Sequence, residues 1–172
     1  DPFSISSSGA VGLWQIMPKT AELLGLRENW WIEERHDPYK STDAAIRYID
    51  YLYKRFNKDI YLSLVAYNAG PTFTSKAIQR NTRRTSTLSY KDLPLSAQTR
   101  NYIPKFLALI ELINNNEKYN IYLPEIPYSK VVDKISFEEQ IEILNFSDFL
   151  NLKPELLYKL NAGYTKWATD PN

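Results

Sequence analysis

Two short segments of the chain place polar side chains in apolar surroundings, where binding or catalytic groups are expected. In the first, residues 9–17 read Gly-Ala-Val-Gly-Leu-Trp-Gln-Ile-Met, and Gln15 is the one polar side chain after the glycines. The small residues 9–12 predict a tight backbone turn, which the apolar side chains of residues 13–17 are expected to bury. A buried amide must find hydrogen-bond partners, so Gln15 either braces the core or faces a cleft.

The second segment is residues 64–70, Leu-Val-Ala-Tyr-Asn-Ala-Gly, where Tyr67 and Asn68 interrupt a small, apolar helix end. A structural interpretation is available for each residue. A helix C-cap explains Asn68 and Gly70, and core packing explains Tyr67. The alternative is a polar site at the end of this helix. Taken alone, the residue types favour the structural interpretation.

Helices are the elements that must position these two segments. Residues 18–24 begin with proline and precede Gly25, which predicts a short helix between them. Thr42 is expected to cap a helix whose apolar positions recur at helical spacing as far as residue 56. Residues 60–69 predict a buried helix stopped by Gly70 and Pro71.

Helical patterns continue after this point. A short helix is expected over residues 74–81, and Ser96 is expected to cap another. Pro104 should break or kink that helix, and an amphipathic pattern then runs to residue 114.

The composition changes beyond residue 123. A connector, Leu-Pro-Glu-Ile-Pro, occupies residues 123–127, and short strands are expected at residues 130–132 and 139–143. Short helices follow from Ser147 and from Pro154. We therefore predict a mainly α chain, with an all-helical domain over residues 1–123 and a small α+β module over residues 124–172.

The overall composition is that of a soluble globular protein. Of the 172 residues, 44% are hydrophobic and 24% are charged, and the formal net charge is only +1. This balance argues against an electrostatic nucleic-acid binder. A basic cluster is interpreted as a solvated helix end; it comprises Lys76, Arg80, Arg83 and Arg84. The high aromatic share, 14%, suits either a core or the stacking walls of a carbohydrate groove.

Metal and membrane functions find little support in the sequence. The chain has no Cys, which excludes disulfides and thiolate metal sites. Its one histidine, His36, cannot build a zinc site alone and is interpreted as structural. No apolar run approaches the roughly 20 residues that span a bilayer.

The two segments together resemble the active-site motifs of a known enzyme family. Gly-Leu-Trp-Gln-Ile-Met-Pro-x-Thr-Ala from residue 12 and Ala-Tyr-Asn-Ala-Gly from residue 66 are similar to motifs of the lysozyme-like lytic transglycosylases, glycoside hydrolase family 23. Residues 29–38, 41–45 and 99–105 are similar to the membrane-bound lytic transglycosylase D group. The resemblance implies a lysozyme-like helical catalytic domain that cuts peptidoglycan glycan strands between MurNAc and GlcNAc.

The resemblance also implies roles for individual residues. Ser6 resembles the serine near the catalytic carboxyl, and Tyr67 resembles the tyrosine beside it. Asn68 resembles the asparagine that supports the site, and Tyr102 resembles a tyrosine of the late helix pair.

Two further residues, Gln15 and Met17, resemble residues that line the saccharide cleft. One departure concerns the family pattern Ala-Gly-x-Gly-x-Val, because residues 71–74 here read Pro-Thr-Phe-Thr. This difference affects the loop beyond the cleft and leaves the expected reaction unchanged.

The family's catalytic glutamate is expected about four residues ahead of Asp1, so residues 1–172 alone are expected to be inactive. The nearest carboxylates within the chain are Glu22, Glu33, Glu34 and Asp37. Glu22 is expected on a helix, and residues 33–37 are interpreted as a charged surface loop that holds salt bridges. None of the four is expected to replace the missing acid.

In the implied reaction one Glu acts as acid and then as base, and the product carries a 1,6-anhydromuramoyl end. No metal or organic cofactor is implied. The expected location is the periplasmic side of the bacterial envelope, with attachment to the outer membrane through an anchor outside this chain left open, and a monomer is expected.

Two rival functions and one open assignment remain at this point. The rival functions are a catalytically silent peptidoglycan-binding protein and a hydrolase that uses water. Residues 124–172 are either a glycan-binding module similar to LysM or a packing appendage.

Overall fold

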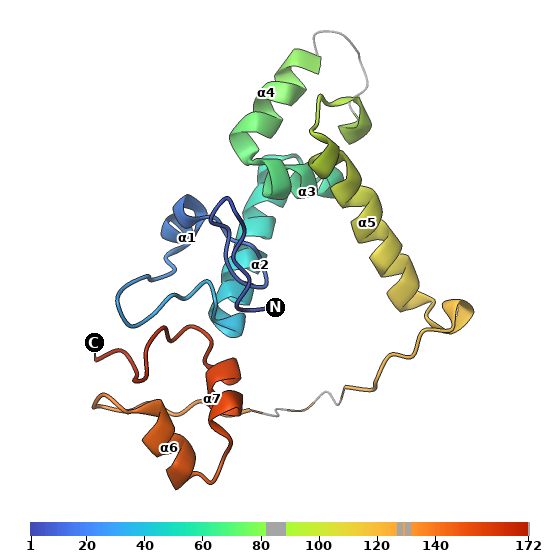
Figure 1. Cartoon of the computed structure of the whole chain (residues 1–172). Coiled ribbons are helices and arrows are strands. Elements are labelled where there is room, and N and C mark those ends of the chain that lie inside the picture. Colours follow the sequence, from blue (N-terminus) through green and yellow to red (C-terminus); the bar gives the residue numbers. More distant parts are fainter. Residues whose placement is uncertain (82–88, 127–128, 130–131, 172) are drawn as a thin grey trace. The chain divides into compact units, whose positions relative to one another are not determined.

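A computed structural model describes residues 1–81, 89–126, 129 and 132–171, and the described part is mainly helical. The helices in chain order are α1 (Pro18–Leu24), α2 (Pro38–Arg55), α3 (Ile60–Ala69), α4 (Pro71–Asn81), α5 (Ala97–Asn114), α6 (Ile143–Phe149) and α7 (Pro154–Leu160) (Figure 1). Two single-turn 3-10 helices, η1 (Tyr90–Asp92) and η2 (Glu117–Tyr119), flank α5. In these described ranges β pairing is limited to isolated bridges. The mainly α class is confirmed.

The chain forms two compact units, and each is described by itself. One unit comprises Asp1–Tyr48 with Val132–Asn172, and the other comprises Ile49–Val131. The boundary between them falls within α2, after Tyr48. The division at residue 123 that the sequence suggests stays a prediction.

Helix ends follow the sequence signals at α1 and α3. Pro18 opens α1, and Gly25 ends it in the left-handed conformation with φ of 74°. At α3, the side chain of Asp59 accepts a hydrogen bond from the backbone N–H of Leu62 at 3.0 Å. At both positions a residue next to the helix forms hydrogen bonds with terminal backbone groups that have no partner inside the helix.

Helix α2 begins five residues earlier than the sequence suggests. The Oδ1 atom of Asp37 accepts hydrogen bonds from the backbone N–H groups of Tyr39 (2.8 Å) and Lys40 (2.9 Å), and Pro38 supplies the first helical residue. The expected N-cap at Thr42 is therefore wrong. Thr42 lies inside the helix, where its hydroxyl accepts a hydrogen bond from Nε1 of Trp14 at 2.7 Å.

Two prolines have roles that the sequence predicts only in part. Helix α3 ends at Ala69, before Gly70 and Pro71, as predicted, but Pro71 also opens α4, three residues before the predicted start. Pro104 is predicted to break or kink a helix; α5 is not broken there, since it continues from Ala97 to Asn114, and the kink stays a prediction. A proline inside a helix removes one backbone hydrogen bond, and the long helix tolerates that loss. The predicted cap at Ser96 is confirmed, because its hydroxyl accepts from the backbone N–H of Thr99 at 3.2 Å.

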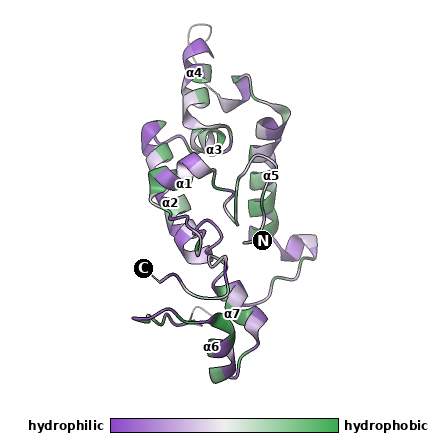
Figure 2. Ribbon diagram, turned by 60° about the vertical axis from the view of Figure 1, so that its left-hand side comes forward, coloured by the Kyte–Doolittle hydropathy of each residue, from purple (hydrophilic) through white to green (hydrophobic). Residues whose placement is uncertain are grey.

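The unit Ile49–Val131 is built around α3. Five consecutive residues of this helix, Leu62 to Ala66, are buried, and α4, α5 and η1 pack against it. Further buried side chains of this unit include Leu93, Leu95 and Ile103. The second half of α5 carries exposed apolar residues, including Leu109 and Ile113, which colour that part of the helix green in Figure 2.

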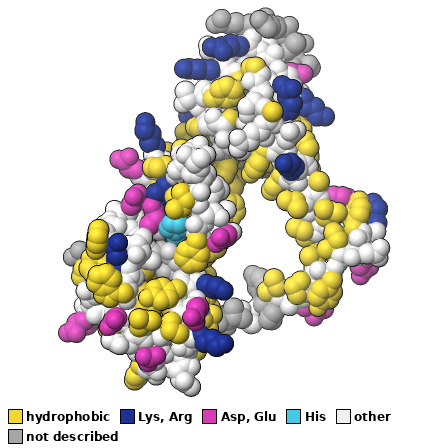
Figure 3. Space-filling view, in the orientation of Figure 1, with side chains coloured by type: hydrophobic (Ala, Val, Ile, Leu, Met, Phe, Trp, Pro, Cys, Tyr) yellow, Lys and Arg dark blue, Asp and Glu magenta, His cyan; other side chains and the backbone are white. Residues whose placement is uncertain are grey.

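The basic cluster is only partly described. Lys76 and Arg80 are exposed on α4, as the sequence predicts for a solvated helix end, and basic side chains are visible around this helix in Figure 3. Arg83 and Arg84 lie outside the described residues.

In the other unit, α6 and α7 pack against each other (Figure 1). The strand expected at residues 139–143 does not form, because only Glu142 pairs, in an isolated antiparallel bridge with Ala168, and Ile143 already begins α6. The strand expected at residues 130–132 falls mostly outside the described residues. Ser147, expected to open a helix, lies inside α6 and donates its hydroxyl to the carbonyl of Leu144.

None of the helices in the described ranges combines the length and apolar character that a membrane span requires.

Candidate functional site

The site residues predicted from the sequence fall in both units. Ser6, Gln15 and Met17 belong to the turn that precedes α1, here named the site turn and comprising residues 4–17. Tyr67, Asn68 and Tyr102 belong to α3 and α5 of the other unit. The two groups are described in turn.

Ser6 closes the first half of the site turn. Its backbone N–H donates to the carbonyl of Ala10 at 2.8 Å, and its hydroxyl accepts from the backbone N–H of Ala10 at 2.9 Å. Val11 then forms isolated bridges with Ile5 and with Ile16. The Ser6 hydroxyl thus has a structural role in the turn, and its remaining lone pair is open to a further donor.

Gly12 allows the site turn to approach a second loop closely. Its φ is +79°, and its backbone N–H donates to the carbonyl of Ser4 at 2.9 Å. A Cβ at this position would lie 2.0 Å from the backbone carbonyl oxygen of Arg35. The turn therefore requires glycine here for its conformation and for its packing.

Gln15 stands on the surface of the site turn and is not buried as its apolar neighbours suggest. Its backbone has φ of 49°, and its Nε2 donates to the carbonyls of Gly12 (2.9 Å) and Ser4 (3.4 Å). Leu13 and Met17 are also exposed, at 47% and 42%, whereas Ile16 is buried. The turn thus presents Gln15, Leu13 and Met17 outward, which favours a surface role for Gln15 over a core role.

Arg35 joins the site turn to the following loop, residues 27–37, here named the charged loop. The guanidinium Nη1 donates to the carbonyls of Gly9 (3.1 Å) and Ile16 (3.4 Å), one in the middle and one near the end of the site turn. Its Nε and Nη2 form a bidentate pair with the Glu33 carboxylate. Glu28 contacts Nη2 from the more exposed side at 3.2 Å. Hydrogen bonding to Glu33 raises the pKa of Arg35, so the guanidinium stays charged.

The centre of the charged loop, residues 32–35, is buried, whereas residues 27–30 are exposed. The predicted salt bridges are present, but the prediction that Glu33 and Glu34 lie at the surface is wrong. Glu33, Glu34 and Arg35 are each exposed by less than a tenth. The Glu34 carboxylate accepts from the backbone N–H of Arg27 at 2.8 Å and from its Nε at 3.0 Å, and it pairs with Lys40. Burial of this kind is possible because each carboxylate has both a cation and hydrogen-bond donors.

The pKa of Glu34 lies below its ordinary value. Burial acts to raise this pKa, but the combined hydrogen bonds from the Arg27 backbone and from the Lys40 and Arg27 side chains lower it further than burial raises it. Glu34 therefore stays ionised, which is the opposite of what a general acid requires.

His36 has the structural role predicted for it. Its Nδ1 lies 2.6 Å from the carbonyl oxygen of Pro2, and its ring lies 6.2 Å from that of Phe3. The histidine thereby ties the first residues of the chain to the charged loop.

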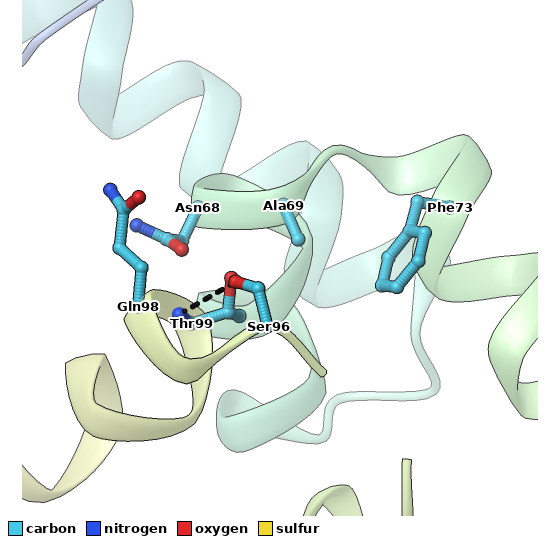
Figure 4. Close-up of a pocket in the computed structure, with 6 residues that line it drawn as sticks. All are labelled: Asn68, Ala69, Phe73, Ser96, Gln98 and Thr99. Carbon is cyan, nitrogen blue, oxygen red and sulfur yellow. Dashed lines mark hydrogen bonds between the residues drawn. The ribbon is translucent and has the colours of Figure 1, made fainter. Parts of the chain in front are cut away.

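Asn68 lines a pocket of about 300 Å³ in the second unit (Figure 4). Tyr67 and Asn68 are half-buried at the end of α3, directly after its fully buried segment. Figure 4 shows the Asn68 and Gln98 amides at one end of the pocket and the Phe73 ring at the other. The pocket therefore combines amide donors and acceptors with an aromatic wall, a combination that suits a sugar.

Sequence reasoning missed Phe73, Gln98 and the capping pair Ser96 and Thr99 as lining residues of this pocket. Phe73 falls in the segment that departs from the family pattern, and it takes a wall position because Pro71 starts α4 directly after Gly70. Gln98 immediately precedes residues 99–105, which resemble a segment of the transglycosylase family. Its position next to that segment was the one sequence signal that could have indicated it.

Tyr102 is half-buried on α5, the helix that packs against α3. Burial raises the pKa of Tyr102, so its phenol remains protonated at neutral pH and can donate a hydrogen bond.

Comparisons with known proteins agree with these features. The family model described as Transglycosylase SLT domain matches residues 1–89. The membrane-bound lytic murein transglycosylase D of Escherichia coli K12 is 32% identical over 163 residues, which cover 95% of this chain and 36% of that protein. The chain thus spans about a third of the length of this relative.

Two further relatives match over shorter ranges. The membrane-bound lytic murein transglycosylase E of Buchnera aphidicola is 34% identical over 92 residues, covering 47% of this chain and 42% of that protein. The soluble lytic murein transglycosylase of Escherichia coli K12 is 28% identical over 107 residues, covering 60% of this chain and 17% of that protein. The family match takes in both the site turn and the end of α3 with its Tyr67–Asn68 pair, and the chain belongs to the Transglycosylase SLT domain family.

Proposed function

We propose that the protein is a peptidoglycan lytic transglycosylase that cleaves the bond between MurNAc and GlcNAc. The observation that carries this proposal is the family match over residues 1–89, because it contains both polar segments that the sequence singles out. The 32% identity to a lytic murein transglycosylase across 95% of the chain supports it.

The proposed reaction needs one carboxyl group, supplied by a glutamate expected about four residues ahead of Asp1. The protonated carboxyl donates its proton to the glycosidic oxygen as the C1–O bond breaks. The resulting carboxylate then takes the proton of the MurNAc C6 hydroxyl, whose oxygen bonds to C1. The acid is regenerated and water is not consumed, so the product is a 1,6-anhydromuramoyl end.

An intramolecular nucleophile makes positioning the main task of the protein. Holding the C6 hydroxyl near C1 replaces a second catalytic carboxylate and is worth several kcal/mol. The in-chain carboxylates Glu33 and Glu34 are already committed to Arg35, Arg27 and Lys40, which supports an acid outside the charged loop.

The binding roles follow from exposure and hydrogen-bonding capacity. Gln15 and Met17 stand exposed on the site turn, and we assign them to the saccharide-binding surface. Asn68 lines the pocket at the end of α3 and is assigned to hold substrate or the catalytic carboxyl. Tyr67 and Tyr102 are assigned as hydrogen-bond donors, and Ser6 as a partner of the substrate or the acid.

The proposed setting is the bacterial cell envelope. Two relatives are named as membrane-bound and as murein transglycosylases, and peptidoglycan strands are the corresponding substrate for this protein. We propose a periplasmic, monomeric enzyme without metal or organic cofactor, with any membrane anchor located outside residues 1–172. Residues 124–172 are proposed to be a packing appendage.

Muropeptide analysis of digested sacculi tests the proposal. The protein that includes the segment upstream of Asp1 is compared with a variant in which the expected glutamate is replaced by glutamine. Anhydro ends released only by the unsubstituted protein support the transglycosylase. Reducing ends would indicate a hydrolase, and retention on sacculi without release would indicate a binding protein.

A further inference from the structure

The C-terminal segment, residues 161–170, is bound to the charged loop by a continuous set of contacts. The backbone N–H of Glu33 donates to the carbonyl of Gly163 at 2.8 Å, and that of Thr165 donates to the carbonyl of Trp31 at 2.9 Å. Ile32 and Tyr164 form an antiparallel bridge between these two bonds. The two segments therefore pair over consecutive residues although they lie far apart in the sequence.

Side chains reinforce this pairing. The Thr165 hydroxyl donates to the carbonyl of Trp30 at 2.8 Å, and the Trp31 and Trp167 rings meet edge to face at 5.6 Å. Lys166 places its ammonium 3.8 Å from the centre of the Trp30 ring. A further group of polar contacts connects Asp170 with Asn29 (3.2 Å) and Arg27 (3.7 Å).

Gly163 allows the C-terminal segment to pack tightly against the charged loop. A Cβ at this position would lie 3.1 Å from the Cβ of Asp37 and 3.6 Å from the carbonyl oxygen of Glu33. Asp37 is the residue that caps α2, so the C-terminal segment reaches the end of the charged loop as well as its middle.

The charged loop in turn holds the site turn through one side chain. Glu33, whose backbone bonds to Gly163, orients the Arg35 guanidinium with its carboxylate. Arg35 then donates to the carbonyls of Gly9 and Ile16, which flank residues 10–15 of the site turn, Gln15 among them. Because Arg35 is buried and has partners on both sides, a displacement of Glu33 must disturb either the ion pair or the turn.

We infer that residues 161–170 act as a positioning clamp for the saccharide-binding turn, with Arg35 as the connecting residue. This inference rests on the proposed function for its effect on substrate. It adds a functional element that the family match, which ends at residue 89, does not contain. The clamp acts through packing and hydrogen bonds and makes no contact with the reacting atoms.

Substitution of Gly163 provides a graded test. Gly163→Ala introduces a contact at 3.1 Å that the neighbouring residues can absorb, whereas Gly163→Val adds two methyl groups at the same place. Ser147→Ala serves as the control, because this buried serine lies in α6 of the same unit and its hydroxyl bonds only locally to Leu144. All variants are made in the protein with its natural flanking segments.

Two measurements separate a positioning role from a general loss of stability. Hydrogen exchange is followed at the amides of Gly9, Val11, Gly12 and Ile16, which are hydrogen-bonded within the site turn. We expect faster exchange there by about tenfold in Gly163→Val, less in Gly163→Ala, and no turn-specific change in Ser147→Ala. On soluble glycan strands we expect KM to rise about tenfold in Gly163→Val, because Gln15 and Met17 lose their position.

The results also separate this inference from the proposed function. Unchanged exchange in the site turn of Gly163→Val, at a lowered melting temperature, would overturn the clamp. An unchanged KM in that variant, with the parent protein active, would overturn it equally. A parent protein that releases no anhydro ends would instead refute the proposed function, and the exchange measurement would still decide the clamp.

Discussion

Gly12 and Arg35 meet backbone to backbone, so closely that a Cβ on Gly12 would lie 2.0 Å from the Arg35 carbonyl oxygen. The contact brings the site turn against the charged loop. The same arginine then bonds through its side chain to Gly9 and Ile16. One residue pair thus fixes both the distance between these loops and the conformation of the turn.

Gly12→Ala should therefore be far more disruptive than Gly9→Ala. Both glycines have positive φ, +79° and +83°, and alanine in the left-handed region costs about 1 kcal/mol or more at either site. Only Gly12 adds a backbone overlap, because a Cβ at Gly9 has nothing within 4 Å. We expect Gly12→Ala to lose about 3 kcal/mol or more in urea unfolding. Equal losses in the two variants would contradict the close contact.

The buried pair of Glu33 and Arg35 should show strong coupling. Arg35→Met leaves the Glu33 carboxylate buried without its cation, which is expected to cost about 3–5 kcal/mol. Adding Glu33→Gln removes that charge, so the double variant should be more stable than Arg35→Met alone. A double-mutant cycle by chemical unfolding measures the coupling. Additive losses would mean that the two side chains do not interact.

Glu34 should contribute to the acid sensitivity of the fold. Its pKa lies below the ordinary value of 4.5 in the folded protein, so folding favours the ionised form. The resulting stabilisation is present above pH 4.5 and is lost as the pH falls through the folded pKa. We expect Glu34→Gln to be less stable at neutral pH and to show a flatter stability profile below pH 4.5. An unaltered profile, measured by thermal unfolding across that range, would contradict this assignment.

Asn68 and Tyr67 should matter more for turnover than for stability. Asn68→Ala removes an amide from the pocket, and Tyr67→Phe removes one hydroxyl from a half-buried ring. We expect turnover of sacculi to fall about tenfold or more in each, because each loses a polar group from the proposed site. Asn115→Ala, at the end of α5, is the control. Full activity in both site variants would leave Asn68 and Tyr67 with a structural role at the end of α3.

The helices were predictable from the sequence where local signals act alone. The sequence correctly identifies Pro18 and Gly25 as the two ends of α1 and Ser96 as the N-cap of α5, because these signals depend only on neighbouring residues. Thr42 failed as a cap because Asp37 and Pro38 form a helix start five residues earlier. Pro104 failed as a helix breaker because α5 continues past the loss of one hydrogen bond.

The burial of residues 32–35 in the charged loop could not be predicted, because it depends on distant partners. In the sequence, Glu33 and Arg35 have the residue types of a protein surface. Their burial is explained by the hydrogen bonds of Arg35 to Gly9 and Ile16 and of Glu33 to Gly163. The alternation at residues 139–143 likewise suggested a strand, yet a single bridge from Glu142 to Ala168 is all that forms in that stretch. The motif residues indicated the family, whereas the position of Phe73 in the pocket wall could be seen only in the structure.

The most direct test of the central claim is mass spectrometry of muropeptides released from sacculi in water enriched in the heavy oxygen isotope. The protein is used with its natural flanking segments, because the proposed acid is expected ahead of Asp1. A transglycosylase gives ends that are lighter than hydrolytic ends by one water and contain no isotope, since the C6 hydroxyl of the substrate is the nucleophile. Reducing ends that carry the heavy isotope would show attack by water and would contradict the proposed function.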